Sequence, residues 1–204
     1  MKKLITLLLC LCALLMTGCS KQDPYANIPY PTVTITMKSG EVMKLELYPA
    51  AAPNTVANFI NLCQDGFYDG LKFHRVVPGY MIQGGDPKGN STGNAGFTIE
   101  GEFTDNGITN PVSHSRGVIS MSRYDEDMNS ASCQFFILQY DYPELDGKYA
   151  AFGRILDSES LKVLDSLATT TVDAYYAPLF DLTIDSITVE THGYDYTAAR
   201  IEED

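Results

Sequence analysis

The stretch Phe-His-Arg-Val-Val-Pro-Gly-Tyr-Met-Ile-Gln-Gly-Gly-Asp-Pro, residues 73–87, carries the strongest structural signal in the chain. Extended apolar runs flank Pro78-Gly79, a dipeptide typical of turns, so two short strands are expected here. Two polar side chains with several hydrogen-bond donors, Arg75 and Gln83, lie in these strands among aromatic and aliphatic neighbours. A guanidinium is costly to bury without partners, so Arg75 either faces water from a surface strand or serves a site.

This stretch resembles the signature of the cyclophilins, which are peptidyl-prolyl cis-trans isomerases. Residues 129–137, Asn-Ser-Ala-Ser-Cys-Gln-Phe-Phe-Ile, resemble the second signature of that family. Residues 145–153, Leu-Asp-Gly-Lys-Tyr-Ala-Ala-Phe-Gly, resemble its third landmark. The resemblance covers roughly residues 32–193 and implies one isomerase domain. Its implied fold is a closed eight-stranded antiparallel β-barrel with a helix at each open end.

The periodicity of the sequence indicates many short strands and two helices. Alternating apolar residues within 33–47 predict a β-hairpin with one buried face. Apolar residues at helical spacing predict a helix over residues 53–66 and a second around 161–168, capped by Asp157 or Ser158. From the pattern alone, an all-β barrel or an all-β sandwich is expected.

By resemblance, Arg75 is the catalytic hydrogen-bond donor, and Gln83 either orients it or holds a substrate carbonyl. Apolar residues would hold the proline ring, and polar residues would line the groove for the flanking peptide. The apolar residues could instead belong to the core, and Gln134 could satisfy buried backbone groups. The substrate-binding residues expected in this way are Phe73, Tyr80, Met81, Ser122, Arg123, Gln134, Phe136, Leu145 and Tyr149.

Four positions depart from the pattern of the family. Tyr80 stands where phenylalanine is usual, and Arg123 stands where many members have asparagine. Glu144 falls where many eukaryotic members have tryptophan, and Tyr149 falls where they have histidine. Many cyclophilins bind the cyclic peptide cyclosporin through the indole N–H of that tryptophan. The carboxylate of Glu144 therefore predicts weak cyclosporin binding.

Two functions from different classes fit the same groove. One is an enzyme that isomerises X-Pro bonds of polypeptides folding outside the cytoplasm. The other is a binding or chaperone module that holds proline-containing segments without needing turnover. Arg75 favours the enzyme, because binding alone would not require that donor.

Composition and charge narrow the possible partners. The net charge is −12, and nucleic-acid binding is not expected because phosphate recognition needs a basic surface. The three histidines show no ligand spacing with cysteines or with each other, so no metal site is expected. The isomerase chemistry needs no cofactor, and a monomer is expected.

The amino terminus reads as a targeting segment. Residues 1–18 combine two lysines, an apolar run and a small-residue end, as a secretory signal does. The ending Leu-Met-Thr-Gly-Cys resembles a bacterial lipobox, which implies lipidation of Cys19 and an extracytoplasmic, membrane-anchored lipoprotein. The alternative is an ordinary signal peptide that leaves a free cysteine. Residues 19–31 would form a tether, and residues 194–204 are expected to be a frayed acidic tail.

Two cysteines lie within the expected domain, Cys63 and Cys133. A pair makes no disulfide framework, and each falls in an apolar segment. They are therefore expected to be small buried hydrophobic residues rather than a redox pair.

Overall fold

The computed structural model describes residues 24–202, and most of their strands belong to one antiparallel sheet. Its eight strands run in the order β3-β4-β7-β6-β8-β2-β1-β9. Their bounds are β1 (Thr32–Met37), β2 (Val42–Leu47), β3 (Arg75–Val77), β4 (Met81–Gly84), β6 (Val118–Met121), β7 (Phe135–Leu138), β8 (Ala151–Ile155) and β9 (Ile184–Glu190). A separate pair joins β5 (Phe97–Thr98) to β10 (Ile201–Glu202).

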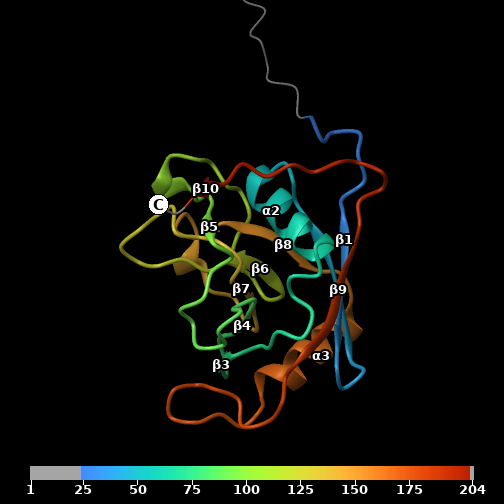
Figure 1. Ribbon diagram of the computed structural model, residues 1–204, viewed down its shortest axis with the longest axis vertical. Coiled ribbons are helices and arrows are strands. Elements are labelled where there is room, and N and C mark those ends of the chain that lie inside the picture. The colour runs from blue at the N-terminus through green and yellow to red at the C-terminus, as the bar shows by residue number, and fades with distance from the viewer. Residues whose placement is uncertain (1–23, 203–204) are drawn as a thin grey trace, which may run out of the picture.

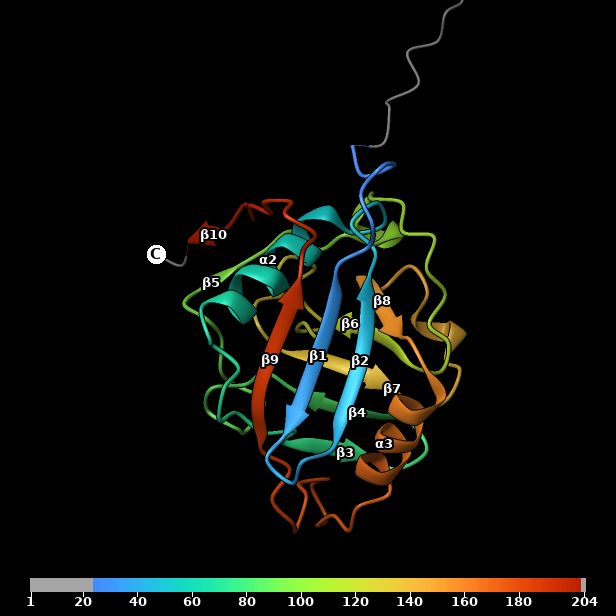
Figure 2. The same ribbon diagram turned by 90° about the vertical axis from the view of Figure 1, so that its right-hand side faces the viewer.

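The sheet curls into a half-barrel whose two edges are β3 and β9 (Figures 1 and 2). In the described part of the chain, β3 and β9 are not paired with each other. The segments that lead into them are linked by an isolated bridge between Lys72 and Thr183 and by a few backbone hydrogen bonds, such as that from the N–H of Ile184 to the carbonyl of Leu71 at 2.8 Å. The closed barrel expected from the family is therefore not shown by the strand pairing. β3 has only three residues, and the N–H of Val76 donates to the carbonyl of Tyr176, a loop residue, at 2.9 Å.

The two predicted helices are α2 (Pro53–Gln64) and α3 (Ser158–Ala168), and they lie toward opposite ends of the curled sheet (Figures 1 and 2). Pro53 occupies the first turn of α2, where its missing N–H is harmless. Asp157 is the N-cap of α3, and its carboxylate accepts from the N–H of Ser160 at 2.7 Å. The predicted hairpin is β1–β2, with alternate side chains buried.

One large core fills the interior of the half-barrel. Aromatic rings meet at its centre, with the ring of Phe59 on α2 5.5 Å from that of Phe135 and 5.3 Å from that of Phe152. Cys63 and Cys133 are both buried and free, and burial raises the pKa of the Cys133 thiol to about 12. They pack as small hydrophobic residues, as predicted.

The expectation of a frayed tail is wrong for residues 194–202. Tyr196 is buried, and its carbonyl accepts from the side-chain amide of Asn61 at 2.7 Å. Asn54 exchanges hydrogen bonds with the backbone of Ala199 in both directions. Polar side chains on α2 thus satisfy the backbone of the tail, and Tyr196 adds apolar burial, which charge alone did not reveal.

The predictions for the amino terminus concern residues that the structure describes only in part. The signal segment and Cys19 lie outside residues 24–202, so neither is tested by it. Within the described range, Tyr25 of the expected tether stacks on Tyr196 at a ring separation of 6.1 Å. No helix between residues 24 and 202 has the length and apolar character needed to cross a bilayer.

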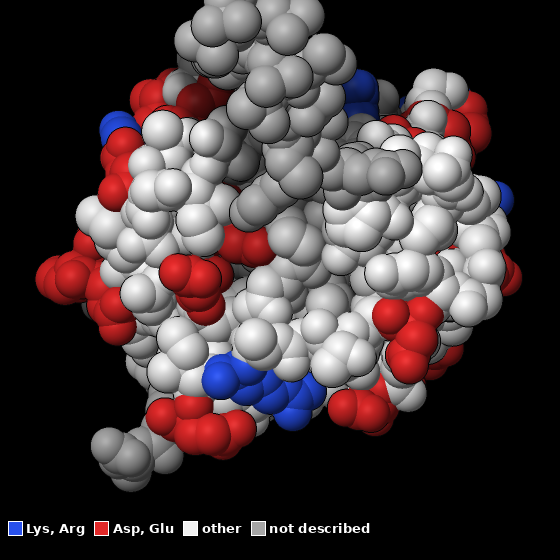
Figure 3. Space-filling model, turned by 90° about the horizontal axis from the view of Figure 1, so that it is seen from above, with Lys and Arg blue, Asp and Glu red and all other residues white. Residues whose placement is uncertain are grey.

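Among the charged side chains on the face shown in Figure 3, acidic ones cover more of the surface than basic ones. A surface of this sign repels polyanions, in keeping with the net charge of −12. The exclusion of nucleic acid stays a prediction based on charge.

Candidate active site

Strand register places the candidate site residues in one row across neighbouring strands. Arg75 of β3 lies opposite Gln83 of β4, and Gln83 lies opposite Phe136 of β7. The row continues to Ser120 of β6, which pairs with Phe136. Directly opposed residues point to the same face of a sheet, so these side chains are neighbours. The signature strands therefore bring a cation, an amide and an aromatic ring together.

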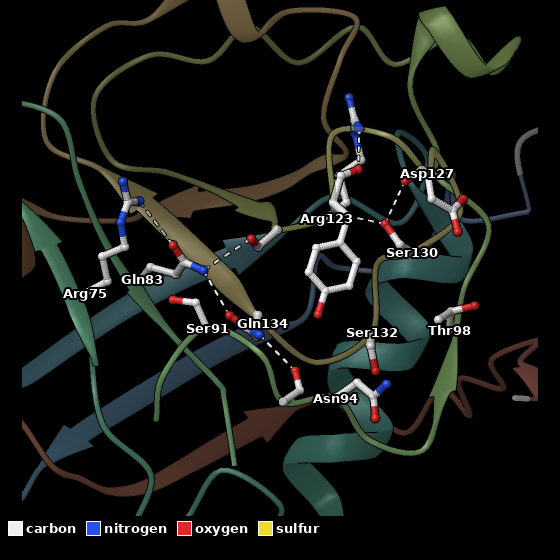
Figure 4. A pocket seen from close by; sticks show the side chains of 13 residues that line it. Arg75, Gln83, Ser91, Asn94, Thr98, Arg123, Asp127, Ser130, Ser132 and Gln134 are labelled. Carbon is white, nitrogen blue, oxygen red and sulfur yellow. Dashed lines mark hydrogen bonds between the residues drawn. The ribbon is translucent and has the colours of Figure 1, made fainter. Parts of the chain in front are cut away.

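A chain of hydrogen bonds fixes the side chain of Gln83 (Figure 4). Arg75 Nη1 donates to Gln83 Oε1 at 3.3 Å. Gln83 Nε2 donates to Gln134 Oε1 at 2.9 Å and to Ser122 Oγ at 3.3 Å. Gln134 Nε2 in turn donates to the carbonyl of Gly93 at 2.8 Å. Because the nitrogen of Gln83 is held by these acceptors, its oxygen must face Arg75.

Arg75 is half-buried and keeps its charge uncompensated. None of the ion pairs within residues 24–202 includes it. Its guanidinium lies 5.8 Å from the centre of the Tyr176 ring, within the range of a cation–π contact. An arginine held by an amide and an aromatic ring, with no carboxylate partner, retains N–H donors for another molecule.

A small group of apolar side chains lies beside this row and is separate from the main core. We call it the apolar cluster. Its buried members are Met81, Phe136 and Leu138, and its half-buried members are Val77, Tyr80, Tyr142, Leu145 and Tyr149.

The rings of the apolar cluster form an open apolar surface. Tyr149 meets Phe136 edge-on at 5.7 Å, and Tyr80 and Tyr142 are 4.4 Å apart between ring centres. The half-buried side chains of the cluster leave part of this surface open to solvent, as a site for an apolar ring requires.

His114 supports the apolar cluster from behind. Its ring stacks on Phe136 at 6.3 Å and 19°. Nδ1 lies 2.9 Å from Asp146 Oδ1, and Nε2 lies 3.1 Å from Ser120 Oγ. Burial lowers the pKa of His114 below its ordinary value, although Asp146 acts in the opposite direction. His114 therefore favours the neutral form beneath the ring of Phe136.

A polar pocket of about 360 Å³ adjoins Arg75 and Gln83 (Figure 4). Its walls come mainly from two loops, one before β5 and one after β6, and carry hydroxyl, amide and charged groups. We call it the polar pocket, and it is lined by Arg75, Gln83, Ser91, Gly93, Asn94, Thr98, Ser122, Arg123, Tyr124, Asp127, Ser130, Ser132 and Gln134.

Most predicted substrate-binding residues fall into one of these two regions, but Phe73 does not. Phe73 is only 1% exposed, and its ring packs against Phe135 at 5.9 Å in the main core. β3 begins at Arg75, so Phe73 precedes the strand that carries the candidate catalytic arginine. Phe73 thus lies where it supports the strands from inside.

Arg123 lines the polar pocket, and two of its guanidinium nitrogens donate to backbone carbonyls. Nε donates to the carbonyl of Lys148 at 2.9 Å, and Nη1 donates to that of Tyr124 at 2.8 Å. The guanidinium also lies 5.1 Å from the centre of the Phe103 ring and 4.8 Å from that of Tyr149. This arginine fastens the loop after β6 to the residues before β8.

Sequence reasoning missed His114 and Tyr142. Tyr142 donates its hydroxyl to the carbonyl of Gly79 at 2.8 Å and so closes one side of the apolar cluster. Neither residue belongs to the quoted signatures, and neither lies in a periodic pattern that would have singled it out. Glu144, by contrast, is exposed on the short 3₁₀ helix Pro143–Leu145 beside the cluster.

Over residues 24–202, no group of three or more histidine, cysteine, aspartate or glutamate side chains is placed to hold a metal ion.

Comparisons with known proteins agree with this geometry. The family model described as cyclophilin type peptidyl-prolyl cis-trans isomerase/CLD matches residues 32–189. A peptidyl-prolyl cis-trans isomerase of Helicobacter pylori is 41% identical over 147 residues, which are 72% of this chain and 85% of that protein. One from Synechococcus elongatus is 48% identical over 125 residues, which are 61% of this chain and 81% of that protein.

Solved structures show the same fold. A cyclophilin type peptidyl-prolyl cis-trans isomerase of Cryptosporidium parvum has a TM-score of 0.70 and 28% identity, covering 79% of this chain and 98% of that chain. A crystal structure of the same protein in the presence of the dipeptide Ala-Pro has a TM-score of 0.69 and 29% identity. It covers 78% of this chain and 98% of that chain.

Proposed function

The chain belongs to the family of cyclophilin-type peptidyl-prolyl cis-trans isomerases, and we propose that Arg75 is its catalytic group. In this proposal, Arg75 lowers the barrier to rotation about the X-Pro bond of the substrate. The chain is a peptidyl-prolyl cis-trans isomerase. The observation that carries the proposal is the placement of one uncompensated guanidinium, oriented by Gln83, beside an open apolar cluster.

Isomerisation of an X-Pro bond requires a hydrogen-bond donor and no nucleophile. Resonance makes rotation about an amide C–N bond slow, with a barrier of roughly 18–20 kcal/mol. Twisting the bond by about 90° removes the resonance and returns a lone pair to the prolyl nitrogen. A donor that reaches this nitrogen stabilises the twisted state more than either planar state. Lowering the barrier by about 7 kcal/mol would accelerate the exchange roughly 10⁵-fold.

Arg75 suits this role because it stays protonated at any physiological pH and its donors form a rigid fork. Gln83 accepts from Nη1, which leaves other N–H groups of the guanidinium for a substrate. The apolar cluster would hold the proline ring while the amide carbon rotates. Proline-containing peptides are expected substrates, and a related isomerase was solved in the presence of Ala-Pro.

The polar pocket would bind the peptide that flanks the proline. Its lining includes the hydroxyls of Ser91 and Ser130 and the carboxylate of Asp127. These groups can bond the backbone or polar side chains of an extended polypeptide. The pocket therefore adds affinity beyond the proline without taking part in the rotation.

We assign the protein to the cell envelope on the basis of its N-terminal sequence. Residues 1–18 would be removed, and lipid on Cys19 would anchor a monomeric domain on the extracytoplasmic side. Its substrates would then be exported proteins that fold there. Cys19→Ala should move the protein from the membrane to the soluble fraction or leave it unprocessed. Fractionation that does not differ from that of the unmodified protein would contradict the anchor.

The catalytic proposal is tested with Arg75→Ala. We expect the exchange rate on a proline-containing tetrapeptide, measured by NMR, to fall about 10²- to 10³-fold, as for loss of one transition-state donor. Arg154→Ala is the matched control, because Arg154 is exposed on β8 and should have no effect. An Arg75→Ala variant that is folded and exchanges at the rate of the unmodified protein would sink the proposal.

A further inference from the structure

The loop between α3 and β9 exposes an unusual amount of apolar surface. It projects at the lower end of the molecule, beyond α3 (Figures 1 and 2). Tyr175 is 85% exposed, Phe180 67%, Leu179 61% and Tyr176 45%. A contiguous apolar patch of this kind on a globular protein often marks an interaction site. We call residues 173–181 the apolar loop.

The apolar loop has a fixed backbone, so its exposure is built into the fold. The carboxylate of Asp173 accepts from the N–H groups of Tyr175 at 2.8 Å and Ala177 at 2.9 Å. The N–H of Asp173 donates to the carbonyl of Ala177, and that of Leu179 donates to the carbonyl of Thr171, both at 2.9 Å. These bonds fix the backbone of the turn, and the side chains of Tyr175, Leu179 and Phe180 are exposed on it.

The same loop touches the candidate catalytic group. The carbonyl of Tyr176 accepts from the N–H of Val76, the neighbour of Arg75, at 2.9 Å. The ring of Tyr176 faces the guanidinium of Arg75 at 5.8 Å. The exposed apolar surface is therefore continuous with the active site through Tyr176.

The two carboxylates of the apolar loop already have partners within the protein, so they do not oppose the binding of an apolar ligand. Asp173 is occupied within the turn, as its hydrogen bonds show. Asp181 pairs with Lys72 at 2.9 Å and accepts from the hydroxyl of Thr183 at 2.6 Å. The surface that the apolar loop offers to a partner is therefore aromatic and aliphatic. Side chains of this kind often anchor protein interfaces.

We propose that the apolar loop binds an apolar segment of the same polypeptide whose X-Pro bond lies at Arg75. An unfolded chain exposes apolar side chains near its prolines, and a folded one buries them. The loop thus directs the enzyme toward unfolded chains. This inference rests on the proposed function of Arg75 and the apolar cluster. It adds a preference for unfolded polypeptides, which those residues alone do not select.

The position of the loop favours this occupant over a lipid surface. The described chain begins at residue 24 at the upper end, whereas the loop lies at the lower end (Figures 1 and 2). With the proposed anchor on Cys19, the loop would point away from the bilayer. It would then meet polypeptides arriving from the aqueous side.

The kinetic test compares three peptides with one Ala-Pro bond each. One is a tetrapeptide, one is a twenty-residue peptide with three leucines flanking the bond, and one is the same peptide with serines. We expect the full-length protein to show about tenfold higher kcat/KM for the leucine peptide than for the serine peptide. Replacing Tyr175, Leu179 and Phe180 together by serine should remove this preference and leave the tetrapeptide rate within twofold.

The control replaces Leu156 and Ile201, which are each 45% exposed outside the loop, by serine. This double variant should keep the leucine preference. Equal kcat/KM for the two long peptides, or a preference that survives the triple substitution, would overturn the inference. Loss of tetrapeptide exchange in the unmodified protein would instead overturn the proposed function, so the two failures are distinguishable.

A fluorescent reporter separates the possible occupants. The chain contains no tryptophan, so Phe180→Trp introduces a single indole at the tip of the loop. Its emission should shift to the blue when the leucine peptide is added and stay unchanged with the serine peptide. A shift with phosphatidylglycerol vesicles alone would indicate a lipid surface. A shift that grows with protein concentration alone would indicate a second copy, and either of these results would overturn the inference.

Discussion

The apolar cluster and the polar pocket meet at Gln83, but they are built in different ways. The cluster takes its central side chains from β4 and β7, where Met81 lies opposite Leu138 and Gln83 opposite Phe136. The pocket takes most of its walls from the loops around β5 and after β6. Strand register therefore specifies the site for the proline ring, and loop conformation specifies the surroundings of the flanking peptide.

The two regions also differ in what a substitution can change. A strand residue such as Phe136 is held by ladder hydrogen bonds and by His114 behind it. A loop residue such as Asp127 is exposed and fixed mainly by local bonds, such as the one from the N–H of Asn129 at 2.8 Å. Changes in the cluster should affect the rotation itself. Changes in the pocket should affect which polypeptide is rotated.

Phe136→Ala should produce the largest effect of the substitutions that distinguish the two regions. It removes the buried ring on which the substrate proline would rest, and loss of several apolar groups from a pocket reduces kcat/KM by about 100-fold. Stopped-flow isomerisation of a tetrapeptide measures this. Removing this buried ring should also lower the free energy of unfolding by about 3–5 kcal/mol.

Leu164→Ala separates stability from function, because Leu164 is a fully buried residue of α3 and lies outside both regions. It should lower the free energy of unfolding by a similar amount and leave the isomerisation rate unchanged. If Leu164→Ala reduces kcat/KM as strongly as Phe136→Ala, the apolar cluster has no special role.

Gln83→Ala should have an intermediate effect, because it breaks the link between the two regions. It deletes the acceptor of Arg75 and the donor to Gln134, while the apolar cluster remains. We expect kcat to fall about 30-fold with little change in KM, as for a group that positions a catalytic donor. A rise in KM alone would show that Gln83 binds substrate instead of orienting Arg75.

The matched control for Gln83→Ala is Asn110→Ala. Asn110 is half-buried, and its side-chain amide, like that of Gln83, is a hydrogen-bond donor. It donates to the backbone carbonyls of Glu102 and Ala151 and does not line the polar pocket. It should change stability without changing kcat.

Glu144→Trp tests the rim of the apolar cluster. The exposed carboxylate beside Leu145 cannot donate a hydrogen bond while ionised, and covering it with an apolar ligand costs desolvation. An indole would supply a donor and aromatic area. We expect cyclosporin to bind about tenfold more tightly, a change of about 1.4 kcal/mol, with peptide isomerisation unchanged. Calorimetry that finds tight binding by the unmodified protein would contradict this account of the rim.

The sequence predicted the strand-built part of the site better than the loop-built part. Arg75, Gln83 and Phe136 were identified through their signatures, and the register brings them together. Phe73 was predicted to bind substrate because it belongs to the same signature, but it precedes β3 and is buried in the main core. Periodicity describes strands and helices, whereas a loop contact depends on chain segments far apart in sequence.

Tyr142, His114 and the apolar loop show the same limit. The bond from Tyr142 to Gly79 spans 63 positions, and that from His114 to Asp146 spans 32. No local pattern encodes such contacts. The half-barrel edge was also missed for this reason, since the partner of Val76 is Tyr176, a loop residue, rather than a strand residue of β9.

The smallest predicted effect is a dependence of the free energy of unfolding on pH, caused by the histidine behind the apolar cluster. The apolar cluster has His114 behind it, and burial lowers the pKa of this imidazole below its ordinary value of 6.5. The unfolded chain therefore binds more protons than the folded one below pH 6.5, so stability increases with pH in that window. The contribution of neutral His114 to the free energy of unfolding is complete above pH 6.5. It is lost as the pH falls through the pKa of His114 in the folded protein.

The measurement is the free energy of unfolding by urea between pH 5 and pH 8. Hydrogen bonds from His114 lower the pKa of Asp146 from 3.8 against the effect of burial, so this carboxyl titrates outside the window. His74, also buried with a lowered pKa, contributes in the same direction. His114→Gln should therefore reduce the slope without abolishing it, and the double variant with His74→Gln should flatten it further. An unmodified protein equally stable at pH 5 and pH 7 would show that neither histidine is held neutral by the fold.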